Sequence, residues 1–188
     1  MTPAPHYRPP ARLNLLIAGM IAVLSTAASA DNGWQTPRIQ GYGKVKPVAG
    51  AQLQPEADRQ HRIVKDVVRA APEAGQVNEG LDRVARLVNL YALAGVPADN
   101  LDLVAVIHGK ATTGVLDDAA YEAEFGITNP STPLIQALVD AGVRLYVCSQ
   151  ALAHHGIDPE AVNDQVTIVS GALPALAIFQ QRGYAFLP

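Results

Sequence analysis

The chain has 188 residues, one cysteine and a formal net charge of −3, and this length is typical of a single domain. Lys and Arg are spread singly along the sequence, which excludes the concentrated basic face that nucleic-acid phosphates require. A chain of this size also buries enough apolar surface to fold without a structural metal or a disulfide.

The first 30 residues have the pattern of a secretory signal peptide. Arg8 and Arg12 supply positive charge, residues 13–24 are almost continuously apolar, and residues 28–30 (Ala-Ser-Ala) form a cleavage site. The apolar run is shorter than the roughly 20 residues of a membrane span, so we expect cleavage and no membrane attachment; an uncleaved anchor is the alternative. Export to the bacterial periplasm would leave the single cysteine buried, paired between molecules, or reactive.

Residues 31–60 are predicted to form an N-terminal arm or linker, because glycines and prolines interrupt any helical or strand period. Trp34 and Tyr42 lie in this segment, and such rings are costly to leave wholly in water. The arm is therefore expected either to pack on the domain or a neighbouring subunit, or to be a flexible linker.

The first predicted strand covers residues 61–68, which are rich in β-branched side chains. Asp66 lies inside it, either as a charge on an exposed strand or near the ligand-binding end of the sheet. A turn then precedes a helix for which Asn78 is the predicted N-cap. This helix has apolar residues at three-and-four spacing and stops at Gly95 and Pro97. Its apolar stripe consists of Leu81, Val84, Leu87, Val88 and Tyr91.

The remaining elements alternate between strands and helices. Further strands are predicted at residues 101–107, 143–147, 166–169 and 184–187. Helical segments are predicted at residues 115–125, from Asn129 to the stop at Gly142, from Ser149 to Gly156, at Asp158-Pro159, and from a Ser170 cap to Gly183. Residues 101–107 are almost entirely apolar, as expected for a strand that is covered on both faces.

This alternation predicts an α/β domain over residues 61–188, a three-layer α/β/α sandwich with a mostly parallel sheet of about five strands. Such sheets bind ligands at the carboxyl ends of their strands. His108 and Cys148 each lie at the carboxyl end of a predicted strand. We therefore expect them to face one crevice although they are distant in the sequence.

Cys148 is the residue around which a function can be argued. It is the only thiol, and it lies where an apolar strand gives way to a helix. Unpaired N–H groups in an opening helix turn carry partial positive charge and favour thiolate over thiol. The alternative is a buried and inert strand-end cysteine, since cysteine is among the most frequently buried residue types.

Several segments resemble the DsrE/DsrF/TusD family of sulfur-relay proteins, specifically a secreted, single-domain DsrE-like member. The matching segments are residues 77–81 (VNEGL), 107–112 (IHGKAT), 129–135 (NPSTPLI), 141–152 (AGVRLYVCSQAL) and 183–185 (GYA). The resemblance implies a small α/β/α sandwich that assembles into dimers, trimers or hexamers. It also implies a persulfide carried on one cysteine at the end of a central strand, and Cys148 resembles that position.

Four residues near Cys148 are candidate binding residues. His108 could hydrogen-bond the thiolate, act as a general base, or simply be satisfied by the backbone. Lys110 could attract a thiolate or oxyanion, or be a solvated surface lysine. Ser149 and Gln150 offer donors to bound sulfur or oxygen, although helix capping explains Ser149 equally well.

No metal or cofactor is predicted. The adjacent pair His154-His155 points in two directions on a helix and has no acidic or Cys cluster to complete a zinc site. Gly109 and Gly114 form neither a dinucleotide fingerprint nor a P-loop, and the sequence contains no Gly-x-Ser-x-Gly hydrolase motif.

These observations favour a periplasmic sulfur carrier, sulfurtransferase-like if catalytic, that holds persulfide sulfur on Cys148 and works as a homo-oligomer with donor and acceptor proteins. One alternative is a non-catalytic oligomeric binding module in which Cys148 is buried. Another is a thiol redox sensor in which Cys148 becomes a sulfenic acid or mixed disulfide. The absence of a second cysteine weakens the sensor hypothesis unless a partner supplies the resolving thiol.

Overall fold

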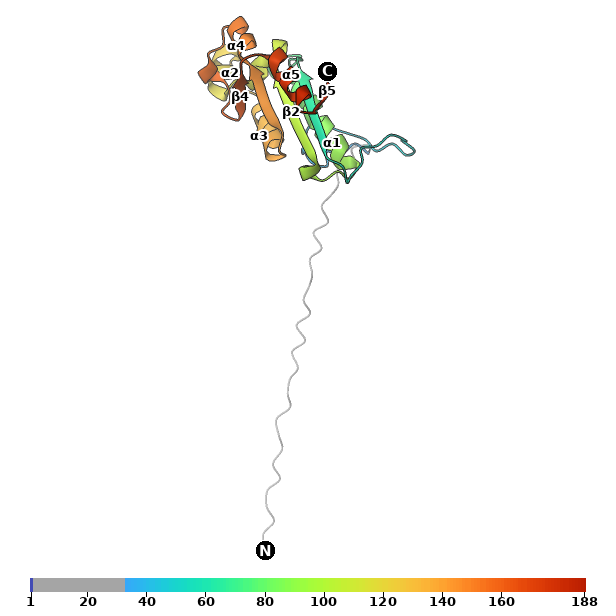
Figure 1. Cartoon of the computed structure of the whole chain (residues 1–188). Coiled ribbons are helices and arrows are strands. Elements are labelled where there is room, and N and C mark those ends of the chain that lie inside the picture. The colour runs from blue at the N-terminus through green and yellow to red at the C-terminus, as the bar shows by residue number, and fades with distance from the viewer. Residues whose placement is uncertain (2–32) are drawn as a thin grey trace. The chain divides into compact units, whose positions relative to one another are not determined.

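The computed structural model describes Met1 and residues 33–188, so residues 2–30 of the predicted signal peptide lie outside its described part (Figure 1). None of the helices in the described part of the chain is long and apolar enough to cross a membrane.

A sheet of five parallel strands forms the centre of the domain, in the order β4-β3-β2-β1-β5 (Figure 1). The strands are β1 (His61–Val67), β2 (Leu101–Ile107), β3 (Arg144–Cys148), β4 (Val166–Val169) and β5 (Ala185–Leu187). Because all of them run the same way, their carboxyl ends share one edge of the sheet. This confirms the predicted α/β class and the parallel sheet of about five strands.

Five α-helices connect and cover the strands. They are α1 (Glu79–Leu93), α2 (Asp118–Phe125), α3 (Thr132–Asp140), α4 (Ser149–His155) and α5 (Ala172–Gln181). Short 3-10 turns occur at Ala98–Asn100, Gly109–Val115 and Pro159–Ala161. The turn at Gly109–Val115 follows directly after His108 at the end of β2.

The sheet is buried on both faces, which makes the domain three-layered. Along β2, Leu103, Ala105 and Ile107 join the apolar cluster that includes buried residues of α1 and α3. The intervening Val104 and Val106 join the cluster that includes α5. This alternation follows from the two-residue period of a strand, and it explains why the sequence of β2 is almost wholly apolar.

The boundaries of α1 follow local rules. The Asn78 side chain accepts a hydrogen bond from Leu81 N at 3.0 Å, which confirms the predicted N-cap. The buried residues of α1 include Leu81, Val84 and Val88 of the predicted stripe. After the helix, Gly95 adopts a positive φ of 82°, a conformation that favours glycine.

The predicted Ser170 cap is wrong. The helix α5 begins at Ala172, Gly171 is its N-cap, and no side chain caps it. Gly171 is still extended, with φ 178° and ψ 150°, so helical geometry starts one residue later than the sequence pattern suggested. The Ser170 carbonyl instead accepts a hydrogen bond from Ser149 Oγ at 2.9 Å.

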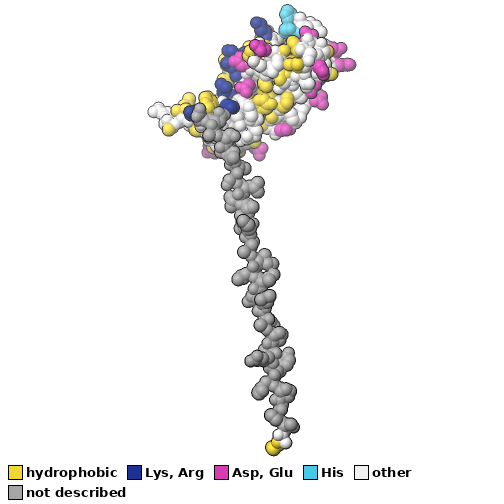
Figure 2. Space-filling model, turned by 180° about the vertical axis from the view of Figure 1, so that it is seen from behind, with side chains coloured by type: hydrophobic (Ala, Val, Ile, Leu, Met, Phe, Trp, Pro, Cys, Tyr) yellow, Lys and Arg dark blue, Asp and Glu magenta, His cyan; other side chains and the backbone are white. Residues whose placement is uncertain are grey.

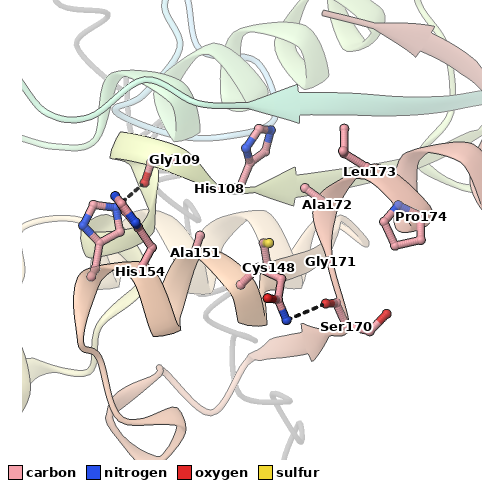
Figure 3. Close-up of a pocket in the computed structure, with 12 residues that line it drawn as sticks. His108, Gly109, Cys148, Ala151, His154, Ser170, Gly171, Ala172, Leu173 and Pro174 are labelled. Atoms are coloured by element: carbon pink, nitrogen blue, oxygen red, sulfur yellow. Dashed lines mark hydrogen bonds between the residues drawn. The ribbon is translucent and has the colours of Figure 1, made fainter.

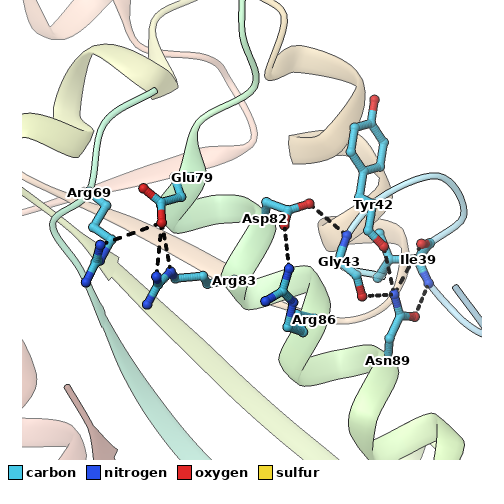
Figure 4. Close-up of polar contacts among 9 residues, drawn as sticks. All are labelled: Ile39, Tyr42, Gly43, Arg69, Glu79, Asp82, Arg83, Arg86 and Asn89. Atoms are coloured by element: carbon cyan, nitrogen blue, oxygen red, sulfur yellow. Dashed lines mark hydrogen bonds and ion pairs between the residues drawn. The ribbon is translucent and has the colours of Figure 1, made fainter. Parts of the chain in front are cut away.

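Part of the predicted arm packs on α1 through the buried Asn89 (Figure 4). Asn89 Oδ1 accepts from Ile39 N at 2.8 Å, and Asn89 Nδ2 donates to Tyr42 O at 2.9 Å and Gly43 O at 3.1 Å. Ile39 and Val45 are almost fully buried. Residues 35–45 therefore pack on the domain, which was one of the two alternatives for the arm. Residues 46–54 are exposed.

Candidate functional site

A pocket of about 420 Å³ opens at the carboxyl edge of the sheet (Figure 3). It lies between the end of β2, the junction of β3 with α4, and the turn that leads from β4 into α5. The lining residues are His108, Gly109, Cys148, Gln150, Ala151, His154, His155, Ser170, Gly171, Ala172, Leu173 and Pro174. The structure therefore brings His108 and Cys148 to one cavity, as their strand-end positions predict.

Cys148 is the last residue of β3 and the N-cap of α4. Its strand partner in the sheet is Val169 of β4, and only 6% of the residue is exposed. Its sulfur points into the pocket in Figure 3. The thiol is thus shielded from bulk solvent and yet open to a molecule that enters the cavity, which combines features of the buried and the reactive hypotheses.

The first turn of α5 forms part of the pocket wall beside Cys148 (Figure 3). No side chain caps the N–H groups at the start of this helix, and Pro174 has no N–H to satisfy. Helix starts of this kind carry partial positive charge. The sequence pattern did not predict these uncapped N–H groups, because it indicated that the Ser170 side chain would accept hydrogen bonds from them.

His108 is held by Asp66, the penultimate residue of β1. His108 Nε2 lies 2.7 Å from Asp66 Oδ1, and the two side chains are 26% and 21% exposed. An ionised carboxylate only accepts hydrogen bonds, so an ionised Asp66 requires Nε2 to be the donor in this contact and leaves Nδ1 as the other ring nitrogen. Asp66 therefore lies near the carboxyl end of its strand, which is the second of the two alternatives for this residue.

A hydrogen bond from His108 to the thiol was one of three alternatives, and within residues 33–188 the partner of His108 Nε2 is Asp66 instead. His108 shares the cavity with the sulfur, but its Nε2 is engaged by Asp66. His108 could therefore act on the thiol only through a ligand in the cavity or by exchanging a proton across the cavity.

Ser149 and Gln150 join α4 to the turn before α5. Ser149 Oγ donates to Ser170 O at 2.9 Å, and Gln150 Nε2 lies 3.4 Å from the same oxygen. Gln150 lines the pocket and Ser149 does not. Ser149 is not a helix cap, since Cys148 takes that position. Lys110 is exposed and lies outside the pocket lining.

His154 and His155 also line the pocket. From the sequence, these two histidines were considered only as metal ligands, and this position was not predicted. His155 Nε2 is 2.9 Å from Gly109 O, and the two imidazole centroids are 5.4 Å apart. No group of three or more His, Cys, Asp or Glu side chains within the described residues is arranged to hold a metal ion. The imidazoles thus act as wall and hydrogen-bonding groups here.

Buried polar side chains fix the loops at this edge of the sheet. Asn78 N donates to Ser131 Oγ at 2.9 Å, and Asn129 Oδ1 accepts from Ser131 N at 2.8 Å. Asn129 Nδ2 also donates to Leu116 O at 2.7 Å. Asn78, Asn129 and Ser131 belong to the sequence segments that carry the family resemblance, so these segments are hydrogen-bonded to one another.

A charged group beside this edge has a shifted pKa. Burial lowers the pKa of Lys65 from its usual 10.5, and the nearby cations Arg83 and Arg69 act in the same direction, against the opposing effect of Asp66. Lys65 Nζ donates to Asp66 O at 2.7 Å. The lysine therefore holds the backbone at Asp66, which in turn positions His108.

The chain is similar to one protein family and to solved structures of other proteins. Residues 52–188 match the DsrE/DsrF-like family. A protein of unknown function, MTH1491 from Methanobacterium thermoautotrophicum, has a similar structure, with 19% identity and a TM-score of 0.47 over 68% of this chain and 98% of that one. The ychN protein from E. coli is similar at 21% identity and a TM-score of 0.48, over 68% of this chain and 97% of that one.

No curated protein matches the sequence. The family match covers well over half of the chain, including every strand and helix of the domain and all the residues that line the pocket. The protein belongs to the DsrE/DsrF-like family.

Proposed function

We propose that the protein is a sulfur carrier that holds one sulfur atom as a persulfide on Cys148. The observation that carries this proposal is the position of the only cysteine in the sequence, at the carboxyl end of β3 and in the wall of an open pocket. Sulfur-relay chemistry, to which the family is generally related, needs a thiolate with access to a sulfur donor.

The transfer is a thiol exchange at sulfur and needs no external oxidant or reductant. The Cys148 thiolate attacks the terminal sulfur of a donor persulfide R–S–SH, so that a new S–S bond forms at Cys148 while the donor S–S bond breaks. The donor leaves as the thiolate R–S⁻, which takes up a proton. In the second half, an acceptor thiolate attacks the same terminal sulfur and Cys148 leaves as thiolate.

The pocket contains two groups that suit this chemistry. The uncapped start of α5 favours negative charge on the sulfur of Cys148 or on its persulfide. His108 has Nδ1 available to accept the thiol proton or return it to a leaving group, because Asp66 occupies Nε2. Asp66 then acts as a positioning residue.

We further propose export to the periplasm, with cleavage after Ala30, and assembly into a homo-oligomer. The signal-peptide pattern of residues 1–30 supports export. Exposed apolar side chains on β4 and α5, Ile168 and Ile178 among them, support assembly. N-terminal sequencing of the protein from a periplasmic extract and light scattering of the purified protein test the two statements; an intact Met1 or a monomer mass would refute them.

The function is tested by intact-mass spectrometry after incubation with polysulfide. We expect the native protein to gain one sulfur atom and Cys148→Ser to gain none. If native Cys148 is alkylated only after denaturation, the protein is instead a binding module. If peroxide adds oxygen to Cys148 and polysulfide adds no sulfur, the protein is instead a redox sensor.

A further inference from the structure

The pocket around Cys148 is much larger than the sulfur atom that it would receive. Its volume is about 420 Å³, within the usual range for small-molecule pockets of about 300–1,000 Å³. At about 30 Å³ per water-sized group, it has room for on the order of a dozen such groups. One transferred sulfur would occupy a small part of this space, and the rest suits the body of an organic molecule.

The lining of the pocket contains no Lys, Arg, Asp or Glu residue. Ala151, Ala172, Leu173 and Pro174 give it an apolar surface, and Gln150, Ser170 and the histidines add polar groups. Lys110, the cation nearest in sequence to His108, is exposed and does not line it. A negatively charged donor would therefore enter without a Lys or Arg side chain in the lining to meet it.

The surface next to the pocket adds negative charge. A neighbouring cavity shares His155 with the pocket and is lined by Glu124 and Asp158. Figure 2 shows histidines on the surface, with Asp and Glu side chains on the same part of the body and Lys or Arg side chains close by as well. Carboxylates beside a cleft disfavour the approach of anions.

The partial positive charge at the start of α5 does not neutralise a negative charge on the body of a donor. A helix start carries roughly half an elementary charge, and in the transfer step this is matched to the negative charge on the Cys148 sulfur. A carboxylate or sulfonate elsewhere on the donor would need a second positive group, and the lining contains no Lys or Arg to supply one.

We propose that the sulfur donor is a small organic hydropersulfide R–S–SH whose body R is uncharged and apolar. This inference rests on the proposed function, because it assumes that Cys148 accepts sulfur. R packs against Ala151, Ala172 and Leu173 while the Cys148 thiolate attacks the terminal sulfur. The new Cys148 S–S bond replaces the donor S–S bond, and R–S⁻ leaves and takes up a proton.

A matched pair of donors tests the proposal. Benzyl hydropersulfide and its 4-carboxy derivative have the same reacting group and differ in the charge of the body. The rate at which the purified protein gains one sulfur is measured by intact-mass spectrometry at about pH 8, where free imidazoles are neutral. Each rate is divided by the rate of the same donor with N-acetylcysteine. We expect a preference for the neutral donor of about 10-fold or more, the size of effect that one unfavourable charge contact of about 1.4 kcal/mol gives.

Two lysine substitutions on α5 test whether the pocket itself sets this preference. Leu173 lines the pocket and is 79% exposed, so Leu173→Lys adds a cation at the cavity without opening the core. Gln181→Lys adds the same charge at the far end of the helix, on another exposed residue outside the pocket lining. We expect Leu173→Lys to remove or reverse the preference and Gln181→Lys to leave it unchanged.

The outcomes separate this inference from the proposed function. If the carboxylated donor reacts at Cys148 as fast as the neutral one, or faster, the neutral-donor inference is overturned while the carrier function stands. An equal effect of the two lysine variants would also overturn it. If no donor adds sulfur to Cys148, the carrier function and the inference both fail.

Discussion

At the scale of single residues, the site depends on a pair that joins two strands. Asp66 and His108 are 42 residues apart in sequence, yet parallel pairing places Asp66 beside Val106 and brings His108 within 2.7 Å of its carboxylate. The carboxylate fixes which imidazole nitrogen is free, and an imidazole with one nitrogen engaged and the other open is suited to proton transfer.

We predict that Asp66→Asn slows sulfur loading of Cys148 by about 10- to 100-fold near neutral pH, since misplaced general bases cost factors of this order. The amide lets His108 rotate and adopt either tautomer, so the pH profile of the loading rate should change shape as well as height. Asp66→Glu should recover part of the rate. An unchanged profile in Asp66→Asn would show that Asp66 is only structural, and the exposed Asp99→Asn variant is the control.

At the scale of elements, the N-terminal segment packs closely on α1 because Gly43 has no side chain at the contact. Gly43 has φ +55°, and a Cβ at this position would lie 2.1 Å from Arg86 N in the backbone of α1. Gly43 N donates to Asp82 Oδ1 at 2.7 Å (Figure 4). The helix and the segment are thus too close for any side chain at Gly43.

We predict that Gly43→Ala lowers the free energy of unfolding by about 3 kcal/mol, from overpacking together with the strained positive φ. Gly41→Ala is the matched control: its φ is +83° and a Cβ would meet nothing within 4 Å, so only the conformational cost of about 1 kcal/mol applies. Chemical denaturation measures both. Equal losses in the two variants would contradict the close contact.

Burial of tyrosine gives a second prediction at this scale. Tyr121 of α2 donates its hydroxyl to Ala74 O at 2.7 Å, and burial raises the pKa of Tyr121 above its usual 10.0. Above about pH 10 the unfolded chain loses this proton before the folded chain does. The folded state then holds more protons, so stability falls as the pH rises.

We therefore expect the free energy of unfolding to decrease with pH above 10 less steeply in Tyr121→Phe than in the parent protein, as measured by urea denaturation in alkaline buffers. Lys65 acts in the opposite sense, because its pKa is lowered and its contribution to stability rises as the pH approaches 10.5. Tyr42→Phe removes a phenol elsewhere and serves as control. The same slope in Tyr121→Phe and the parent would refute the assignment.

At the scale of the whole molecule, much of the fold was predictable from local pattern. The apolar run of β2, the Asn78 cap and the stop at Gly95 each follow from the residues themselves, and the alternation of elements gives the parallel sheet. The position of Cys148 at a strand end follows from the apolar run that precedes it. Its position in one pocket with His108 was also predictable, since the carboxyl ends of parallel strands share an edge of the sheet.

The remaining features depend on contacts between distant segments, which a local pattern does not contain. The Asp66–His108 pair needs the register of β1 with β2. The first turn of α5 is uncapped because Gly171 is extended and is itself the N-cap. The sequence pattern instead predicted Ser170, one residue earlier, as the cap. Asn89 looks like one more polar residue in a helix, and only the folded chain shows that it binds the segment around Ile39.

The most direct test of the carrier is a complete loading and unloading cycle. The native protein is loaded with polysulfide, freed of excess donor and treated with a small thiol, and its mass is followed by spectrometry at each stage. We predict a gain of one sulfur per chain on Cys148 and its full return to the thiol, with release of the same amount of sulfane sulfur. A native chain that takes up no sulfur, although its unfolded form does, would contradict the account.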